Sequence, residues 1–225
     1  MKMDLNNNLR KIYEPYLEEV KRSLLEYPKH FSYPLLMHCF DDFYEAKRKL
    51  LIVGKETFSW QGILSAEVTL DTIIKGYKEF KLGQNYYNSP FWRFSLSLQN
   101  ILNGNVLPLG FLWTNFSKLD YNKTSPPARL IKQNPKIFGF DLLVEELNIV
   151  KPDILVFLTN WNNEYGWQFE RVFNGVQYET LKEGYLYLCK HHLLPKKTFL
   201  TWHPNGLQYK GKFSEVLNLI SDNCK

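Results

Sequence analysis

The chain has 225 residues, which suits one α/β domain with a substantial core better than two domains. Hydrophobic residues make up 44% and charged residues 23%, close to the averages of globular proteins. No apolar run approaches the ~20 residues that span a bilayer, which argues against a membrane-spanning protein. The net charge of +5 favours a polyanionic partner such as nucleic acid without requiring one.

The three cysteines, Cys39, Cys189 and Cys224, are odd in number and far apart. They lack the CxxC or CxxH spacing of zinc and iron–sulfur sites, which predicts a reducing compartment and no cysteine-held metal. The amino-terminal residues do not contain the apolar segment of a secretory signal. We therefore expect a cytoplasmic protein without membrane contact.

The first predicted element is an amphipathic helix over residues 4–27, because apolar side chains recur there at helical spacing. A short helix is predicted over 34–46. The apolar sequence "RKLLIVG", residues 48–54, then predicts a strand that is buried on both faces. Two helices follow, at about 69–81 and at 90–103, where the pair Ser-Pro marks the start of the second.

The second half of the chain continues the alternation of strands and helices. "LGFLWTN", residues 109–115, predicts a second strand, and a helix over 138–149 leads to a third strand at 153–159. A helix is predicted over 163–174, and residues 176–199 indicate a hairpin around a glycine turn.

The chain ends with "KTFLTWHP", residues 197–204, as a fourth core strand, and with a closing helix over 211–223. Strands that alternate with helices predict a three-layer α/β/α sandwich around a mainly parallel four-stranded sheet, with function at the carboxyl ends of the strands. We expect a single domain over residues 1–225, in which residues 1–45 form a helical extension packed on the rest.

Distinctive polar residues stand at or just after the carboxyl ends of the four predicted core strands. They are Glu56, Asn115, Asn160 and His203. Because parallel strands end at the same edge of a sheet, these side chains are expected to converge there. Polar groups that converge at one edge are what a binding pocket is made from.

Four segments around these residues resemble motifs of the uracil-DNA glycosylase superfamily. "GKETFSWQG", residues 54–62, is similar to the family's water-activating Gly-Gln-Asp-Pro-Tyr-His-Gly motif, and "GFLWTN" resembles its "GVLLLN" strand. "KPDILVFLTN" resembles the third strand, and "HPNGLQYKGKF", residues 203–213, resembles its "HPSPLSxxRGFF" loop. The segments occur in the family's order, and the resemblance spans roughly residues 48–215.

The resemblance implies a DNA repair protein that flips a damaged base, uracil or a related one, from single- or double-stranded DNA and hydrolyses its N-glycosidic bond. It implies base excision by a hydrolase that needs no metal and no other cofactor, and we expect a monomer. Glu56 stands at the place of the family's water-orienting Asp. Asn115 would hydrogen-bond the base edge, and His203 would stabilise the departing base anion.

Further residues acquire roles by the same resemblance. Gly54 opens the first motif, and Phe58 stands where the family has a Tyr that crowds the pyrimidine C5 position. The last loop would meet DNA through Pro204, Asn205, Leu207 and Lys210. Leu207 fits two roles equally well, either filling the gap left by a flipped base or anchoring the final helix.

Other interpretations of these residues stay open. Glu56 is also typical of a solvated turn, Asn115 of a loop start that bonds its own backbone, and His203 of a strand-end cap. Lys55, Glu56 and Thr57 replace the family's Gln, Asp and Pro. The base-stacking "GLxFS" segment has no counterpart, which leaves Phe58, Trp60 or Trp113 as the stacking residue.

These departures motivate two alternative functions. The first is a member of the same fold that binds nucleic acid or a nucleobase without cleaving it. The second is an α/β protein that acts on some other small molecule at the same strand ends.

Overall fold

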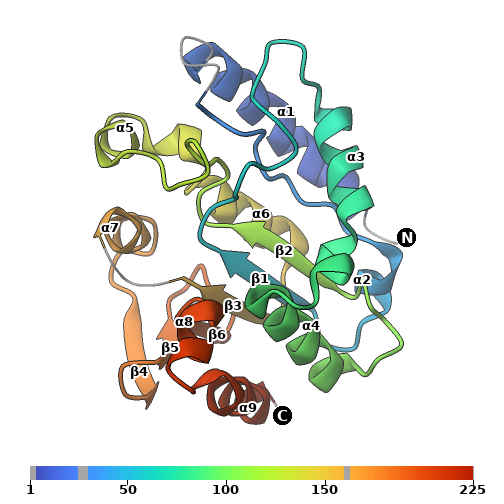
Figure 1. Ribbon diagram of the computed structural model, residues 1–225, viewed down its shortest axis with the longest axis vertical. Coiled ribbons are helices and arrows are strands. Elements are labelled where there is room, and N and C mark those ends of the chain that lie inside the picture. The colour runs from blue at the N-terminus through green and yellow to red at the C-terminus, as the bar shows by residue number, and fades with distance from the viewer. Residues whose placement is uncertain (1–3, 25–29, 160–162, 225) are drawn as a thin grey trace.

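The computed structural model describes residues 4–24, 30–159 and 163–224 (Figure 1). Its α-helices are α1 (Leu5–Leu24), α2 (Asp41–Glu45), α3 (Leu70–Phe80), α4 (Pro90–Asn103), α5 (Ala128–Gln133), α6 (Leu142–Val150), α7 (Asn163–Val172), α8 (Pro204–Tyr209) and α9 (Phe213–Cys224). Two 3-10 helices are η1 (Lys81–Tyr86) and η2 (Pro135–Phe138). The strands are β1 (Leu50–Gly54), β2 (Phe111–Asn115), β3 (Ile154–Leu158), β4 (Gln177–Lys182), β5 (Leu186–Lys190) and β6 (Lys197–Thr201).

Across the described ranges these strands form one six-stranded sheet in the order β2-β1-β3-β6-β5-β4. β2, β1, β3 and β6 run parallel to one another, and β5 and β4 add an antiparallel hairpin beside β6. The predicted α/β class is confirmed. The predicted count of four strands is wrong, because Leu186 and Cys189 of the hairpin are buried and extend the sheet into a mixed one.

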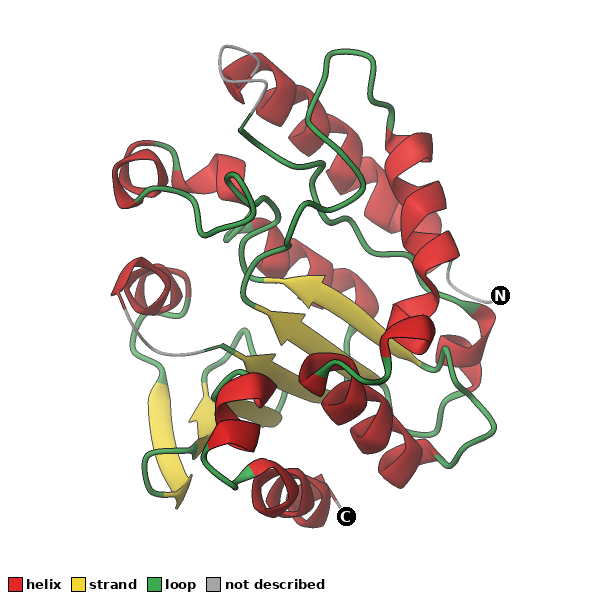
Figure 2. Cartoon of the chain, viewed as in Figure 1, coloured by secondary structure: helices red, strands yellow, loops and turns green. Residues whose placement is uncertain are grey.

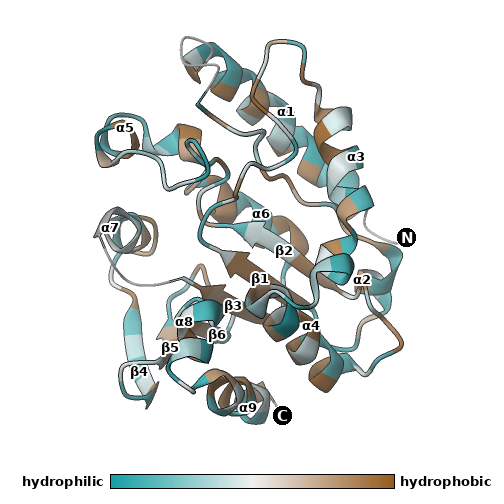
Figure 3. Cartoon of the chain, viewed as in Figure 1, coloured by the Kyte–Doolittle hydropathy of each residue, from teal (hydrophilic) through white to brown (hydrophobic). Residues whose placement is uncertain are grey.

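Strands β1, β2 and β3 are buried at every position, as expected for parallel strands covered on both faces. Figure 1 shows α6 behind these strands and α4 in front of them. In Figure 3 the central strands are brown, and the outer strand β4 is teal. The arrowheads of β1 and β2 point the same way in Figure 2, so the loops that follow them begin at one edge of the sheet.

The predicted helix over 34–46 is wrong for most of its length, because only Asp41–Glu45 is helical. The segment before it is extended and buried. The Leu35 N–H donates to the Lys118 carbonyl at 2.8 Å, and the Cys39 N–H donates to Asn6 Oδ1 at 2.8 Å. Hydrogen bonds to distant residues therefore replace the intrahelical ones that the apolar periodicity predicted.

A fully buried ion pair lies between α1, β2 and α6. Lys118 Nζ stands 2.6 Å from Glu146 Oε2, and neither side chain is exposed. The Tyr13 hydroxyl donates to Glu146 Oε1 at 2.8 Å, and the Thr114 hydroxyl donates to Oε2 at 3.3 Å. Helix α1 is thereby fixed to the rest of the core through a charged group as well as through its apolar face.

Candidate functional site

Three polar side chains meet at the carboxyl ends of parallel strands. Glu56 follows β1, Asn115 is the last residue of β2, and His203 follows β6. All three line one cavity of about 1230 Å³, together with Gly54 and Phe58. This volume exceeds the roughly 300–1,000 Å³ of pockets for drug-sized ligands, so the cavity can take more than a single ring. Asn160, the fourth predicted residue, lies outside the described residues.

Asn115 is oriented by its own strand. Its Oδ1 accepts a hydrogen bond from Trp113 Nε1 at 3.2 Å. Because an indole N–H only donates, the amide oxygen must face Trp113. The other end, Nδ2, is buried and has no hydrogen-bond partner among the described residues, although Asn115 is only 1% exposed. A buried amide donor is therefore present at the cavity wall.

Gly54 is required by the position of Asn115. The two residues are register partners on β1 and β2, and the amide lies across the space that a Gly54 side chain would occupy. A Cβ built on Gly54 would stand 2.3 Å from Asn115 Oδ1 and 3.3 Å from a ring carbon of Phe91. Gly54 thus permits the close approach of the Asn115 side chain to β1.

We expect Gly54→Ala to lower the free energy of unfolding by about 1–3 kcal/mol, because the added methyl group displaces the buried Asn115 amide. Ligand binding in the cavity should weaken as well. Chemical denaturation measures the first effect. Gly206→Ala is the matched control, since a Cβ there meets only Trp202, at 3.3 Å, and should cause little or no loss. Equal stability of both variants would contradict this account of Gly54.

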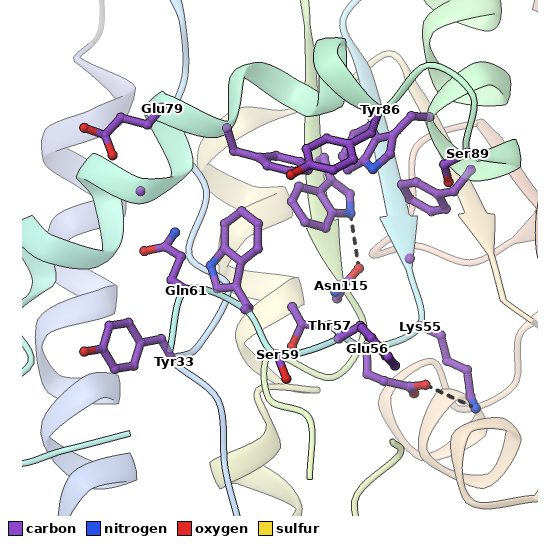
Figure 4. A pocket seen from close by; sticks show the side chains of 18 of the residues that line it. Tyr33, Lys55, Glu56, Thr57, Ser59, Gln61, Glu79, Tyr86, Ser89 and Asn115 are labelled. Carbon is purple, nitrogen blue, oxygen red and sulfur yellow. Dashed lines mark hydrogen bonds and ion pairs between the residues drawn. The ribbon is translucent and has the colours of Figure 1, made fainter. Parts of the chain in front are cut away.

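Glu56 belongs to a small polar cluster with Lys55 and Ser125. The Ser125 hydroxyl donates to Glu56 Oε2 at 3.1 Å, and Lys55 Nζ donates to Ser125 Oγ at 2.9 Å. Lys55 Nζ also lies 3.6 Å from Glu56 Oε1. Figure 4 shows Lys55 and Glu56 pointing toward one another at one side of the pocket. The carboxylate is thus oriented by the Ser125 hydroxyl and by the ion pair with Lys55.

Tyr165 of α7 covers this cluster. Lys55 Nζ lies 4.9 Å from the centroid of its ring. Burial, and after it the negative charge of Glu56, raises the pKa of the Tyr165 phenol well above its ordinary value. The hydroxyl makes no hydrogen bond of good geometry among the described residues. It is a neutral donor placed beside the carboxylate.

His203 is held in one tautomer. It caps α8, and its Nδ1 accepts a hydrogen bond from the Asn205 N–H at 3.2 Å. Burial, and after it the positive charge of Lys55, lowers the pKa of the imidazole. A neutral ring whose Nδ1 accepts must carry its proton on Nε2. Phe91 stacks on the ring at 5.8 Å between centroids and an interplanar angle of 23°.

The loop that carries Glu56 contains strained backbone. Ser59 and Gln61 have φ of 56° and 57°, values that residues other than glycine rarely adopt. Each costs about 1–3 kcal/mol and persists only where other contacts hold it. The buried Asp120 carboxylate supplies such contacts, because its Oδ2 accepts from the Thr57 hydroxyl at 2.6 Å and from the Ser59 N–H at 2.9 Å.

Eight aromatic side chains of Phe, Tyr and Trp contribute to the cavity wall. Trp113 lies edge-to-face with Trp60 at 5.2 Å and with Trp92 at 4.8 Å between ring centroids. The three residues predicted as stacking candidates, Phe58, Trp60 and Trp113, all line the cavity. Phe58 is 75% exposed, and its ring lies 5.9 Å from Lys123 Nζ.

Sequence reasoning missed several residues of this site. Phe80, Tyr86, Phe91 and Trp92 also line the cavity. The Ser-Pro start of α4 is the one local signal for Phe91, since it directs the first turn of that helix to the strand ends. Ser125 and Asp120 lie in a separate loop, and no sequence pattern in that loop predicts their contacts with the site.

The residues of the last loop differ in their exposure. α8 packs against α4 and α9 with Pro204 and Leu207 buried. Because Leu207 is buried, its side chain is not presented at a loop tip. Of the two roles predicted for it, this burial fits the anchoring of the final helix. Asn205 and Lys210 are exposed. Tyr209 is 85% exposed, with Lys210 Nζ 5.6 Å from its ring centroid.

Comparison with known proteins adds no relative. No family model matches the chain, and no curated protein is significantly similar to it. Within the described ranges, no three His, Cys, Asp or Glu side chains are grouped so that they could hold a metal ion. None of the helices described combines the length and apolar character that a bilayer crossing needs.

Proposed function

We propose that the chain is a divergent member of the uracil-DNA glycosylase superfamily, with an α/β/α arrangement, that releases a damaged base from DNA by hydrolysis. One observation carries the proposal. A carboxylate, an amide and a neutral imidazole, at the positions that resemble the family's functional residues, line a single cavity at the carboxyl ends of β1, β2 and β6. Such an edge is where parallel α/β sheets bind their ligands.

The geometry fits the charges that base release creates. The bond between the sugar C1′ and the base nitrogen breaks, and its electron pair leaves with the base. The water oxygen bonds to C1′, and a water proton passes to the Glu56 carboxylate, whose Oε2 accepts from Ser125 and whose Oε1 lies 3.6 Å from Lys55 Nζ. The Nε2–H of His203 donates a hydrogen bond to the base anion, and Asn115 Nδ2 donates to a base oxygen.

Contact with nucleic acid is supported by two exposed aromatic rings, each with a lysine beside it. These are Phe58 with Lys123 and Tyr209 with Lys210. Aromatic faces stack on bases, and lysines neutralise phosphates. The net charge of +5 has the sign that such a partner requires.

The proposal is tested by base release. The purified protein is incubated with single- and double-stranded oligonucleotides that contain uracil, hypoxanthine and a broad panel of other modified bases. Abasic sites are then cleaved by alkali, and the fragments are counted. We expect release of at least one base. No release from any member of the panel would refute the enzymatic proposal.

We expect His203 to titrate below the ordinary imidazole value of 6.5, because burial and the charge of Lys55 both lower its pKa. The imidazole is then neutral at neutral pH in the folded protein and keeps a single proton, on Nε2. A ¹⁵N NMR titration of the imidazole checks the midpoint and the Nε2–H tautomer. As the pH falls from 7.5, ionisation of His203 should change the rate of base release less than ionisation of an ordinary imidazole would. A midpoint above 6.5 would contradict the neutral-donor role.

A binding protein without turnover is the alternative, and one observation favours it. Both oxygens of Glu56 already have protein neighbours, Ser125 at 3.1 Å and Lys55 at 3.6 Å. A carboxylate engaged in this way is less available to water. This alternative predicts DNA binding that weakens with salt, shows no base release and is unaffected by Glu56→Ala.

A further inference from the structure

The indole N–H of Trp60 is a second buried donor in the cavity wall. Trp60 is 8% exposed, and its Nε1 has no hydrogen-bond partner among the described residues. Buried polar groups in native proteins are nearly always hydrogen-bonded, so each exception calls for an explanation. Trp60 lines the same cavity as Asn115, whose Nδ2 is likewise without a partner.

The chain holds Trp60 in this position at a cost in backbone strain. Its two neighbours, Ser59 and Gln61, both have positive φ. The Ser59 N–H is bound by Asp120 at 2.9 Å, and Gln61 Nε2 donates to the Ile73 carbonyl at 3.2 Å. The indole is thus fixed from both sides by bonds outside the cavity.

Trp113 relates the two donors to one another. Its ring lies edge-to-face with Trp60, at 5.2 Å and 82°, and its Nε1 orients Asn115. Trp60 and Asn115 therefore each contact Trp113, and both line the same cavity. Gln61 and Tyr33 mark one side of the pocket, and Lys55 and Glu56 lie on the other (Figure 4).

We propose that Trp60 is a specificity-determining residue, whose indole N–H donates to a carbonyl oxygen of the bound base while Asn115 Nδ2 donates to a second one. The inference rests on the proposed function, since it assumes that a base occupies the cavity. It predicts selection for rings with oxygen acceptors on two edges, because a ring that lacks one of them leaves a buried donor unpaired.

The test compares uracil with the two pyrimidinones that each retain one of its carbonyl oxygens. Binding of the three free bases to the full chain is followed in ¹H–¹⁵N spectra, in which six tryptophans give indole signals and Trp60→Phe assigns one of them. We expect saturating uracil to shift the Trp60 indole proton downfield. The pyrimidinone that lacks the oxygen bound by Trp60 should leave the Trp60 indole signal in place. It should also bind about 3- to 10-fold more weakly than uracil.

The affinities of the Trp60→Phe variant for the same three bases provide a second test, which does not depend on the spectra. The variant should lose the preference for uracil over that one pyrimidinone and keep its preference over the other. If uracil binds, but the indole signal is unmoved or the variant weakens all three bases equally, the role of Trp60 is refuted and the proposed function stands. If the wild-type chain binds no base and releases none from DNA, the proposed function itself fails.

Discussion

Glu56→Gln is expected to lower the rate of base release by about 10²- to 10⁴-fold, the usual contribution of a positioned proton acceptor. The substitution keeps the size of the side chain and its acceptor for the Ser125 hydroxyl. In the proposed reaction, it removes the charge that would face the developing sugar cation and the group that would take the water proton. Single-turnover rates on the best substrate of the panel measure the loss, and binding to uncleaved DNA should change little.

Glu79→Gln is the matched control for this experiment. Glu79 lines the same cavity and also has a lysine partner, Lys75 at 3.8 Å, but it belongs to α3 and does not follow a strand end. Its substitution should leave the rate within about twofold, since it takes no part in the proposed chemistry. Similar losses for both variants would point to the overall charge of the cavity, and retention of the full rate by Glu56→Gln would rule out the assigned role.

The second large effect concerns stability. Lys118→Met is expected to lower the free energy of unfolding by about 3–5 kcal/mol, because it leaves the Glu146 carboxylate buried without its cation. Tyr13 and Thr114 would still donate to the carboxylate, but neither carries a positive charge. Urea denaturation at pH 7 measures the change.

Two further variants separate a buried charge from lost packing. The double substitution Lys118→Met with Glu146→Leu should recover much of the loss, because both charges are then absent. Lys75→Met breaks an exposed pair with Glu79 and should cost no more than about 1 kcal/mol. A double variant as unstable as Lys118→Met would indicate that shape, and not the unpaired charge, dominates.

Much of the strand framework follows from local sequence. Each of the runs that became β1, β2, β3 and β6 is short and apolar, and each borders a loop or a polar residue at its carboxyl end. Only burial between two layers accommodates such runs, so their parallel arrangement was predictable. It was not predictable that β5 and β4 belong to the same sheet, because pairing between β5 and β6 depends on contacts between separate segments.

The site was predictable to a similar extent. Glu56, Asn115 and His203 each follow a predicted strand, so their convergence needed only the parallel sheet. The orientation of Asn115 by Trp113 could also be suspected, since the two residues stand two positions apart on one strand. The contacts of Ser125 and Asp120 could not be predicted, because a contact between two loops produces no periodic pattern in the sequence.

Asp120 has a consequence for anyone who wishes to move this site to another protein. It does not line the cavity, yet it binds Thr57 and Ser59, and its own N–H is bound by Ser32 at 3.2 Å. A graft of residues 54–62 alone would carry Glu56 without this support and should relax to an ordinary turn. The smallest transferable unit also includes Ser32 and Asp120, neither of which lines the cavity.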